Sequence, residues 1–288
     1  MTEEEAPSRS VARYYDRNTS RFLLVGRGRR SYSIHRELWG PGVTSAREAT
    51  EYVNRLVADE VGGLALGRPP TVLDFGCGVG GTLFHLAERF PGATLVGVTV
   101  SPRQVEIAAR LSKRLGHASR CTFVRGDFQT VELGTRADAV VAVESLAHAT
   151  DRDAFLANAT RHLRAGGRLI VVDDFLSAEE EALDGRRRRL VDQLRAGWRA
   201  HGLGTLEALV GAAAARGLVP EKTVDLTHLV RPRSRVRDFV VAVVAPPLAR
   251  LGLSGVPLFG NLTGGHAVQV GLSEGFLRYR LLVLRESG

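Results

Sequence analysis

Cysteine is scarce in this sequence, and that limits the compartments and scaffolds open to the chain. Cys77 and Cys121 are the only cysteines among 288 residues. A disulfide framework needs more of them, so none is expected, and a reducing, cytoplasmic location is predicted. The opening residues, MTEEEAPSRS, are polar and acidic. They do not resemble a secretory signal.

Long apolar segments are also missing. The longest, FVVAVVAPPLARLGL, is interrupted by Pro246 and Pro247 and is too short to cross a bilayer, so no stable membrane insertion is expected. The apolar fraction of 44% is typical of a globular protein. The length suits one large domain, or a core domain with an elaborated cap.

Lysine is nearly absent, although the chain is basic. The net charge is +8, yet Lys113 and Lys222 are the only lysines. A basic balance can indicate nucleic acid, a membrane surface or an anionic substrate. Here the arginines are mostly scattered at helical spacing and aromatic residues make up only 6%, which favours solvated helix faces and no nucleic-acid partner. The run Arg186 to Arg189 is the exception.

The centre of the chain alternates apolar strands with helices. This order predicts an α/β fold with a parallel, Rossmann-like sheet covered on both faces. Strands are expected at 71–76, 94–100, 121–127, 137–145 and 167–175, and helices at 82–90, 101–116 and 151–167, the last closed by Gly166. Two further strands are expected at 221–229 and 276–287.

The two ends of the chain are expected to form a helical cap. Residues 1–68 are predicted to be an N-terminal helical cap segment, including a helix capped by Ser45. Residues 69–288 are predicted to be the core, with helical insertions at about 176–216 and 230–275. Within the second insertion, FGNLTGGHA is expected to be a glycine-rich loop.

The stretch VLDFGCGVGG carries the strongest motif. Its glycines fall at Gly76, Gly78 and Gly80, whereas a dinucleotide fingerprint requires G-x-G-x-x-G. This spacing disfavours an NAD-binding oxidoreductase. Glycines in such a turn let a ligand lie against bare backbone, which a Cβ would obstruct.

With this motif in place, the core from about Thr71 to Phe175 resembles the class I S-adenosylmethionine (SAM)-dependent methyltransferases. VLDFGCGVGG is similar to their motif I, and SAM is the cofactor that the resemblance implies. It further implies that Asp74 orders the glycine loop and helps to hold the methionine amino group. Asp127 would accept from the adenine amine, with Phe128 packed on the base.

A departure from the general family pattern narrows the resemblance. Most class I enzymes have an acid at the end of the second strand, whereas this chain has Thr99 in the sequence GVTVSPRQ. That pattern resembles the branch of cyclopropane synthases, tocopherol methyltransferases and sterol C-methyltransferases. The resemblance implies cofactor contacts from Thr99 and Gln104, and closure over the methionine end by Tyr32 and Ser33.

Candidate catalytic residues follow the fourth strand, in VESLAHATD. The resemblance places Glu144 beside the transferred methyl group, and His148 could accept a proton. His148 could equally be a helix-capping or satisfied loop histidine. Four other histidines show no comparable setting, namely His35, His85, His162 and His266. No ligand cluster suggests zinc, so no metal site is predicted.

The cap is expected to select the methyl acceptor. An alkene acceptor would form a carbocation that needs aromatic faces and then a base, and Tyr15 is a candidate catalytic residue in such a wall. Other candidate walls are Tyr14, Trp39, Phe128, Trp198 and Phe259. The arginine run, with Arg231, Arg233 and Arg235, could bind a diphosphate, and Mg²⁺ is expected only with such an acceptor. An exposed basic helix face is the alternative.

The predicted function is SAM-dependent C-methylation of a lipophilic, terpenoid small molecule in secondary metabolism. The whole chain resembles bacterial terpene (prenyl) C-methyltransferases. The alternative is O- or N-methylation of a small aromatic metabolite. An RNA methyltransferase is disfavoured because the fourth strand ends in VESLAH and not in a motif such as NPPY. A homo-oligomer formed through the N-terminal arm and a non-enzymatic scaffold stay open.

Overall fold

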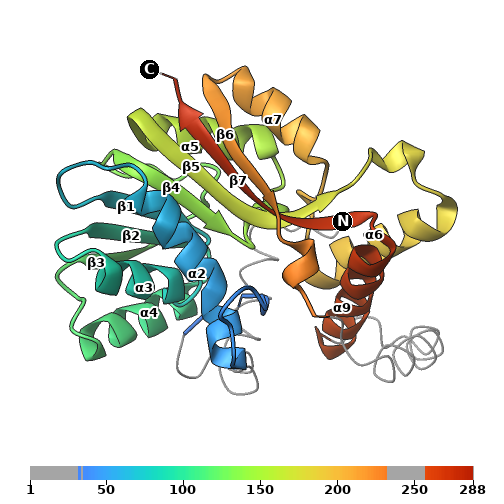
Figure 1. Cartoon of the computed structure of the whole chain (residues 1–288), viewed down its shortest axis with the longest axis horizontal. Helices are drawn as coiled ribbons and strands as arrows, with labels where there is room; N and C mark the ends of the chain where they lie inside the picture. Colours follow the sequence, from blue (N-terminus) through green and yellow to red (C-terminus); the bar gives the residue numbers. More distant parts are fainter. Residues whose placement is uncertain (1–31, 34, 232–256, 288) are drawn as a thin grey trace, which may run out of the picture.

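The computed structural model describes residues 32, 33, 35–231 and 257–287. Its strands and helices alternate through the core, as the sequence predicts (Figure 1). The strands are β1 Thr71–Phe75, β2 Thr94–Thr99, β3 Cys121–Arg125, β4 Ala137–Val143, β5 Leu163–Leu176, β6 Leu218–Asp225 and β7 Leu277–Glu286. The α-helices are α2 Ala46–Gly62, α3 Gly81–Arg89, α4 Pro102–Arg114, α5 Arg152–His162, α6 Gly185–Trp198, α7 Leu206–Ala214 and α9 Pro257–Glu274.

All seven strands form one sheet in the order β3-β2-β1-β4-β5-β7-β6. The first five pair in parallel, and β7 runs antiparallel between β5 and β6. The predicted Rossmann-like class I methyltransferase sheet is confirmed. The strand order reverses between β1 and β4, and open α/β sheets bind ligands outside the carboxyl ends of the strands at such a point.

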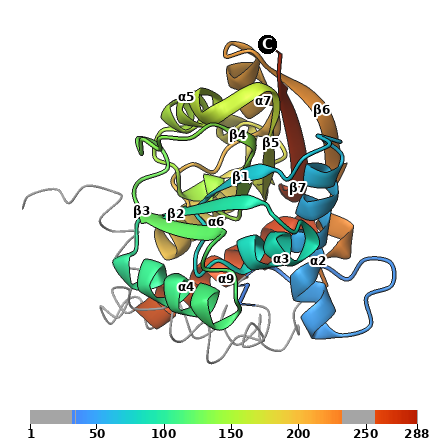
Figure 2. The ribbon, with the colours of Figure 1, turned by 90° about the vertical axis from the view of Figure 1, so that its left-hand side faces the viewer.

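Helices cover both faces of the sheet, and neighbouring residues of a strand enter opposite cores. In β1, Val72 packs with α2 and α3, whereas Leu73 packs with α5 and α7. Figure 2 shows α2, α3 and α4 on one side of the sheet and α5 and α7 on the other. Alternating contacts of this kind need apolar residues at every position, which explains the unbroken apolar runs in the sequence.

Predicted helix caps are mostly confirmed. Ser45 accepts a hydrogen bond from the Glu48 amide, and the Glu48 side chain accepts one from the Ser45 amide, so α2 begins with a complete capping box. The Ser101 side chain caps α4, because its oxygen accepts a hydrogen bond from the Gln104 amide. Gly166 does not close α5, because the helix ends at His162 and β5 begins at the next residue.

Helices α6 and α9 pack together beside the carboxyl end of β5 (Figure 1). Their shared core includes Leu194 of α6, Ala267 of α9 and Leu176 of β5. The predicted loop FGNLTGGHA is wrong, since these residues lie inside α9. Glycine is tolerated in this helix because a Cβ on Gly264 would stand 2.6 Å from the Trp198 ring. Close packing between helices therefore outweighs the low helix propensity of glycine.

Two glycine-to-alanine changes in helices should act in opposite directions. Gly264→Ala is expected to lower the free energy of unfolding by about 1–3 kcal/mol through overpacking against Trp198. Gly211→Ala in α7 is the matched control, because nothing lies within 4 Å of its added Cβ. There only propensity changes, and stability should rise by about 0.5–1 kcal/mol. Urea unfolding of both variants measures the two signs, and a stabilising Gly264→Ala would contradict the packing argument.

Candidate active site

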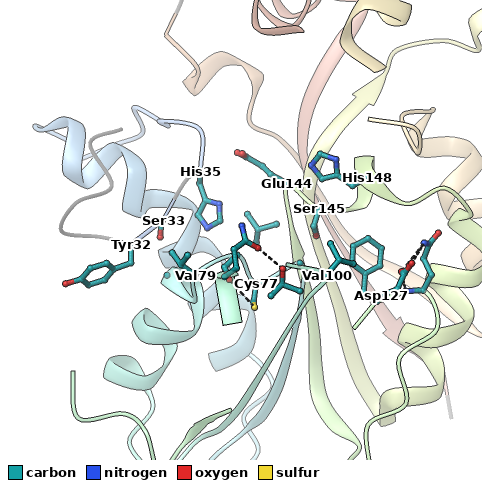
Figure 3. A pocket seen from close by; sticks show the side chains of 18 of the residues that line it. Tyr32, Ser33, His35, Cys77, Val79, Val100, Asp127, Glu144, Ser145 and His148 are labelled. Carbon is teal, nitrogen blue, oxygen red and sulfur yellow. Dashed lines mark hydrogen bonds between the residues drawn. The ribbon is translucent and has the colours of Figure 1, made fainter. Parts of the chain in front are cut away.

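A cavity opens at the carboxyl ends of β1 and β4, where the topology predicts a ligand site (Figure 3). It encloses about 940 Å³ of empty space, part of it open to solvent. Ten of the predicted site residues line it: Tyr32, Ser33, Gly76, Gly78, Thr99, Gln104, Asp127, Phe128, Glu144 and His148. Asp74 and Gly80 lie outside the lining set. Tyr15 lies outside the described residues and stays a prediction.

The glycines of the motif serve different purposes. Gly76 has φ +89, and a Cβ there would collide with the Cβ of Ser145. Gly78 has φ +54 and nothing within 4 Å of an added Cβ, so its bare side faces open space in the cavity wall. A Cβ on Gly80 would meet the rings of Phe123 and Phe84 at 2.8–2.9 Å. Gly80 is therefore needed for the turn and for packing, and not for ligand approach.

Asp74 is a buried carboxyl group beneath this turn. It is 2% exposed, and it accepts no hydrogen bond from any described residue. Burial raises its pKa to about 7, because an ionised carboxylate is poorly solvated there. A buried acid without a partner fits the positively charged amino group of SAM, as the family resemblance implies for this residue.

Thr99 and Gln104 are joined at the end of β2. The Thr99 hydroxyl donates to Gln104 Oε1 at 2.6 Å and accepts from the Ser101 amide at 3.3 Å. Both side chains are buried and line the cavity. A paired hydroxyl and amide thus stand where most class I enzymes have an acid.

The loop after β3, where the resemblance places adenine, contains one cavity residue that the sequence motif does not mark. Asp127 accepts hydrogen bonds from both the amide and the side chain of Gln129. Gln129 Oε1 in turn accepts from the Thr150 hydroxyl and the Asp151 amide. Gln129 therefore links the loop after β3 to the start of α5 across the cavity wall.

Phe128 is held at the cavity wall by other aromatic rings. It stacks on Phe75 at 6.3 Å between ring centroids and meets Phe155 edge-on at 5.6 Å. Since its ring also lines the cavity, it can offer a face to a base without leaving this cluster.

Tyr32 and Ser33, which precede the core in the sequence, lie against the end of the glycine turn. A Cβ on Gly81 would collide with Ser33 Oγ, and the Ser33 hydroxyl accepts from Asn54 at 2.9 Å. The Tyr32 ring points away from the cavity in Figure 3. Its hydroxyl accepts from Arg114 at 2.7 Å. The two residues therefore border the cavity, but the phenol of Tyr32 faces outward, and their closure over the methionine end stays a prediction.

Glu144 is held in an unusual backbone conformation at the end of β4. Its φ is +50, a region that non-glycine residues adopt rarely and mostly at functional sites. Glu144 Oε1 accepts from the Tyr279 hydroxyl at 2.7 Å and from the Arg36 amide at 2.8 Å. These contacts fix the carboxylate at the cavity wall.

A buried charge cluster supports that carboxylate, and sequence reasoning did not find it. The Arg36 guanidinium binds both oxygens of Asp174 at 2.6 and 2.7 Å and lies 4.4 Å from the Tyr279 ring centroid. Burial and the nearby Glu144 raise the pKa of Tyr279 well above its usual value, so its hydroxyl stays protonated and donates. No motif marks these residues, because they come from three distant parts of the chain.

Two histidines line the cavity on either side of Glu144 (Figure 3). Burial lowers the pKa of His148, whose Nδ1 is 3.2 Å from the Arg199 carbonyl oxygen. His35 was not expected in the site, but it lines the same cavity and burial lowers its pKa too. By contrast, His162 accepts from the Leu133 amide in the core, in accord with the expectation that it is structural.

The arginine run lies outside this cavity. Arg186 binds Glu274 at 2.7 Å, and Arg187 lies 3.5 Å from Asp184. Arg188 and Arg189 are exposed on α6. No residue of the run lines the cavity, and its role in binding a diphosphate stays a prediction. Arg231 stacks on Trp39 at 3.5 Å, whereas Arg233 and Arg235 lie outside the described residues, as do Tyr14 and the side chain of Phe259.

Metal clusters and membrane-spanning helices are both missing from the described residues. In this part of the chain, no group of three or more His, Cys, Asp or Glu side chains could hold a metal ion. None of the helices that the structure describes is long and apolar enough to cross a membrane.

Comparison with known sequences assigns the core. Residues 73–169 match the family described as Methyltransferase domain. Ajmaline N-methyltransferase of Rauvolfia serpentina is 26% identical over 76% of this chain and 77% of its own. The S-adenosyl-L-methionine-dependent Diels-Alderase of Talaromyces variabilis is 28% identical over 99% and 96%. Cycloartenol-C-24-methyltransferase 1 of Oryza sativa subsp. japonica is 30% identical over 65% and 52%.

Several solved structures have a similar fold. Geranyl diphosphate C-methyltransferase from Streptomyces coelicolor A3(2) superposes with a TM-score of 0.68 at 19% identity, covering 98% of this chain and 99% of its own. The cyclopropane synthase from Mycobacterium tuberculosis gives 0.75 at 16% identity, covering 99% and 100%. The strand order, glycine turn and sequence matches together define a SAM-binding fold. These matches support a class I SAM-dependent methyltransferase.

Proposed function

We propose that this methyltransferase transfers the methyl group of SAM to carbon in a lipophilic, terpenoid small molecule of secondary metabolism. The main observation in support is the carboxylate of Glu144, which two hydrogen bonds fix at the cavity wall beside the glycine turn. The similarity to a plant sterol C-methyltransferase supports the acceptor class. A cytoplasmic location and a homo-oligomer remain predictions from the sequence.

The residues present fit SAM, which when bound supplies an electrophilic methyl group on a sulfonium. Asp74 would hold the amino group, and the bare side of Gly78 leaves room for the ligand. Thr99 and Gln104 line the side of β2, and Asp127 with Phe128 would bind adenine. The negative charge of Glu144 would face the positive charge of the cofactor, where a fixed carboxylate can attract it.

Transfer of this kind depends mainly on alignment, because the reaction is an in-line displacement at one carbon. The protein's tasks are therefore to hold both reactants, exclude water and receive the proton that the acceptor releases. Glu144, His35 and His148 are the titratable groups that line the cavity between the cofactor residues and the cap.

A second candidate is O- or N-methylation of a small aromatic metabolite. The specific observation in its favour concerns aromatic rings: of the described residues that line the cavity, only Tyr32 and Phe128 are aromatic, and both belong to the cofactor side. A carbocation would need ring faces nearby, whereas a hydroxyl or amine needs only a base. The similarity to an alkaloid N-methyltransferase also supports this candidate.

Methyl transfer from labelled SAM to a panel of acceptors tests both. The panel contains prenyl alcohols, prenyl diphosphates with and without Mg²⁺, phenols, amines and bulk RNA. Label in a new carbon–carbon bond is the expected result. Label on oxygen or nitrogen would replace the first candidate by the second, and label in RNA would overturn both.

The full-length match to a Diels-Alderase adds a control to this assay. Each acceptor that is consumed should be analysed for an isomeric product of unchanged mass. Isomerisation that needs SAM but does not consume it would contradict methyl transfer as the activity of this chain.

A further inference from the structure

His35 stands at the end of a chain of hydrogen-bonded polar side chains, which the sequence alone does not reveal. Asn54 of α2 donates to Ser33 Oγ at 2.9 Å. Thr82 of α3 donates its hydroxyl hydrogen to Asn54 Oδ1 at 3.0 Å. Thr82 Oγ1 also lies 3.0 Å from His35 Nε2. This chain of hydrogen bonds joins the segment at residues 33–35 to helices α2 and α3.

These contacts determine which nitrogen of His35 carries the hydrogen. A threonine hydroxyl has one hydrogen, and in Thr82 it points to Asn54. The oxygen of Thr82 can then only accept from His35, so Nε2 is the protonated nitrogen. In a neutral imidazole the other nitrogen is unprotonated. Nδ1 therefore carries the lone pair.

The surroundings of His35 favour its neutral imidazole near pH 7. Burial lowers the pKa of His35, and this effect outweighs the attraction of Glu144 and the hydrogen bonding of Asn54, which both raise it. His35 also borders the cavity together with Glu144 (Figure 3). A neutral imidazole at the cavity wall can accept a proton, and the imidazolium that results would face a carboxylate.

The placement of His35 is coupled to that of Glu144. The next residue, Arg36, donates its amide hydrogen to Glu144 Oε1, and its guanidinium binds Asp174. One short segment thus positions both a base and the carboxylate opposite it. His148 reaches the same cavity from the loop after β4, with Nδ1 directed to the Arg199 carbonyl.

We propose that His35 is the proton acceptor of the methyl transfer and that Thr82 and Asn54 are positioning residues that set its tautomer. This assignment rests on the proposed function. An electron pair of the acceptor forms the new bond to the methyl carbon as the carbon–sulfur pair leaves with sulfur. The acceptor then carries one proton too many, and His35 Nδ1 takes it. Charge balances, because the sulfonium becomes a neutral thioether while the imidazole becomes imidazolium.

Steady-state kinetics of His35→Gln provide the first test. The turnover number kcat should fall by about 10²–10⁴-fold, the range for loss of a general base, while SAM affinity measured by calorimetry stays within about threefold. His85→Gln is the matched control, since His85 lies on α3 and does not line the cavity. Equal kcat values for His35→Gln and wild type would overturn the assignment. Loss of SAM binding in His35→Gln would make His35 a cofactor-site residue and would also overturn it.

The positioning role has its own pair of variants. Thr82→Val removes the oxygen that accepts from Nε2 and should lower kcat by about tenfold, whereas Thr82→Ser keeps that oxygen and should retain most activity. A merely structural Thr82 would give similar losses of stability and activity in both variants. That outcome would overturn the tautomer argument.

Nuclear magnetic resonance gives a readout that needs no acceptor. In ¹⁵N-histidine-labelled protein, the signals that disappear in His35→Gln identify this residue. At pH 7.5 its Nε2 should show the shift of a protonated nitrogen and Nδ1 that of an unprotonated one. The reverse tautomer would overturn the proposal even if the enzyme methylates the expected acceptor. If no acceptor is methylated by wild type while this tautomer is seen, the proposed function fails independently.

Discussion

Replacing Asp74 with asparagine is expected to weaken SAM binding by about 100-fold or more, since charge-assisted hydrogen bonds to a buried carboxylate are among the strongest contacts. The carboxyl group is buried, and its pKa is raised to about 7 by loss of solvation. Binding of an ammonium group would therefore ionise it. Wild-type affinity should rise between about pH 6 and 8 as the carboxylate forms, and Asp74→Asn should abolish this rise.

The same substitution should stabilise the protein without ligand. The folded-state pKa of Asp74 is above its ordinary value of 3.8, so the folded state binds more protons than the unfolded state between those two values. The free energy of unfolding therefore falls as pH rises from about 4 to 7 and is level above. By this linkage, Asp74→Asn should be more stable than wild type by about 3–4 kcal/mol at pH 8.

Calorimetry with SAM and urea unfolding at several pH values measure these two effects. Asp173→Asn is the matched control: burial raises its pKa to about 7 as well, but its carboxylate already accepts from the amides of Ala147 and Asp174, whereas Asp74 accepts from no described residue. The control should leave the pH dependence of SAM affinity intact. Wild-type affinity in Asp74→Asn would refute the role given to this carboxyl group.

Replacing Glu144 with glutamine is expected to lower kcat by about 10²–10³-fold, the loss typical of one preorganised electrostatic contact in a transition state. Glutamine keeps an oxygen that can accept from the Tyr279 hydroxyl and the Arg36 amide. The geometry should therefore persist while the negative charge is lost. SAM affinity should change little by comparison, because Asp74 and the glycine turn remain.

Tyr279→Phe tests the position of the Glu144 carboxylate separately from its charge. It leaves the carboxylate of Glu144 in place but removes the hydrogen bond of 2.7 Å that restrains it. Turnover should fall by only about three- to tenfold, and the free energy of unfolding by about 1–2 kcal/mol, because Tyr279 is fully buried. Single-turnover rates and thermal unfolding measure the two quantities. Undiminished turnover in Glu144→Gln would move the chemistry to the two histidines or to the cap.

Local patterns were sufficient for the core of the fold. The strands and helices from Thr71 to Phe175 follow from apolar runs, turn residues and caps that act over a few residues, and the structure contains each of them, although α5 ends and β5 begins earlier than predicted. The glycine turn could be predicted for the same reason, because positive φ at Gly76, Gly78 and Gly80 is a local requirement. The segment FGNLTGGHA failed as a loop because its glycines pack a helix against Trp198, a contact that is distant in sequence.

The site divides in a similar way. Residues in motifs, such as Thr99, Asp127 and Glu144, were assigned to the cavity from the sequence, and the structure brings them together there. His35 was not, since a single histidine in an irregular segment has no pattern. Its importance comes from Thr82 and Asn54, which only folding brings beside it.

The sequence by itself indicated the family, the positions of the first five strands along the chain and the cofactor motif, because each depends on residues close together in the chain. Only the tertiary structure decided how Glu144 is held. Arg36, Asp174 and Tyr279 lie far apart along the chain, and they meet because β7 returns between β5 and β6 and places Tyr279 opposite Asp174. Burial then raises the pKa of Tyr279, since desolvation depends on everything packed around a group and not on its neighbours in sequence.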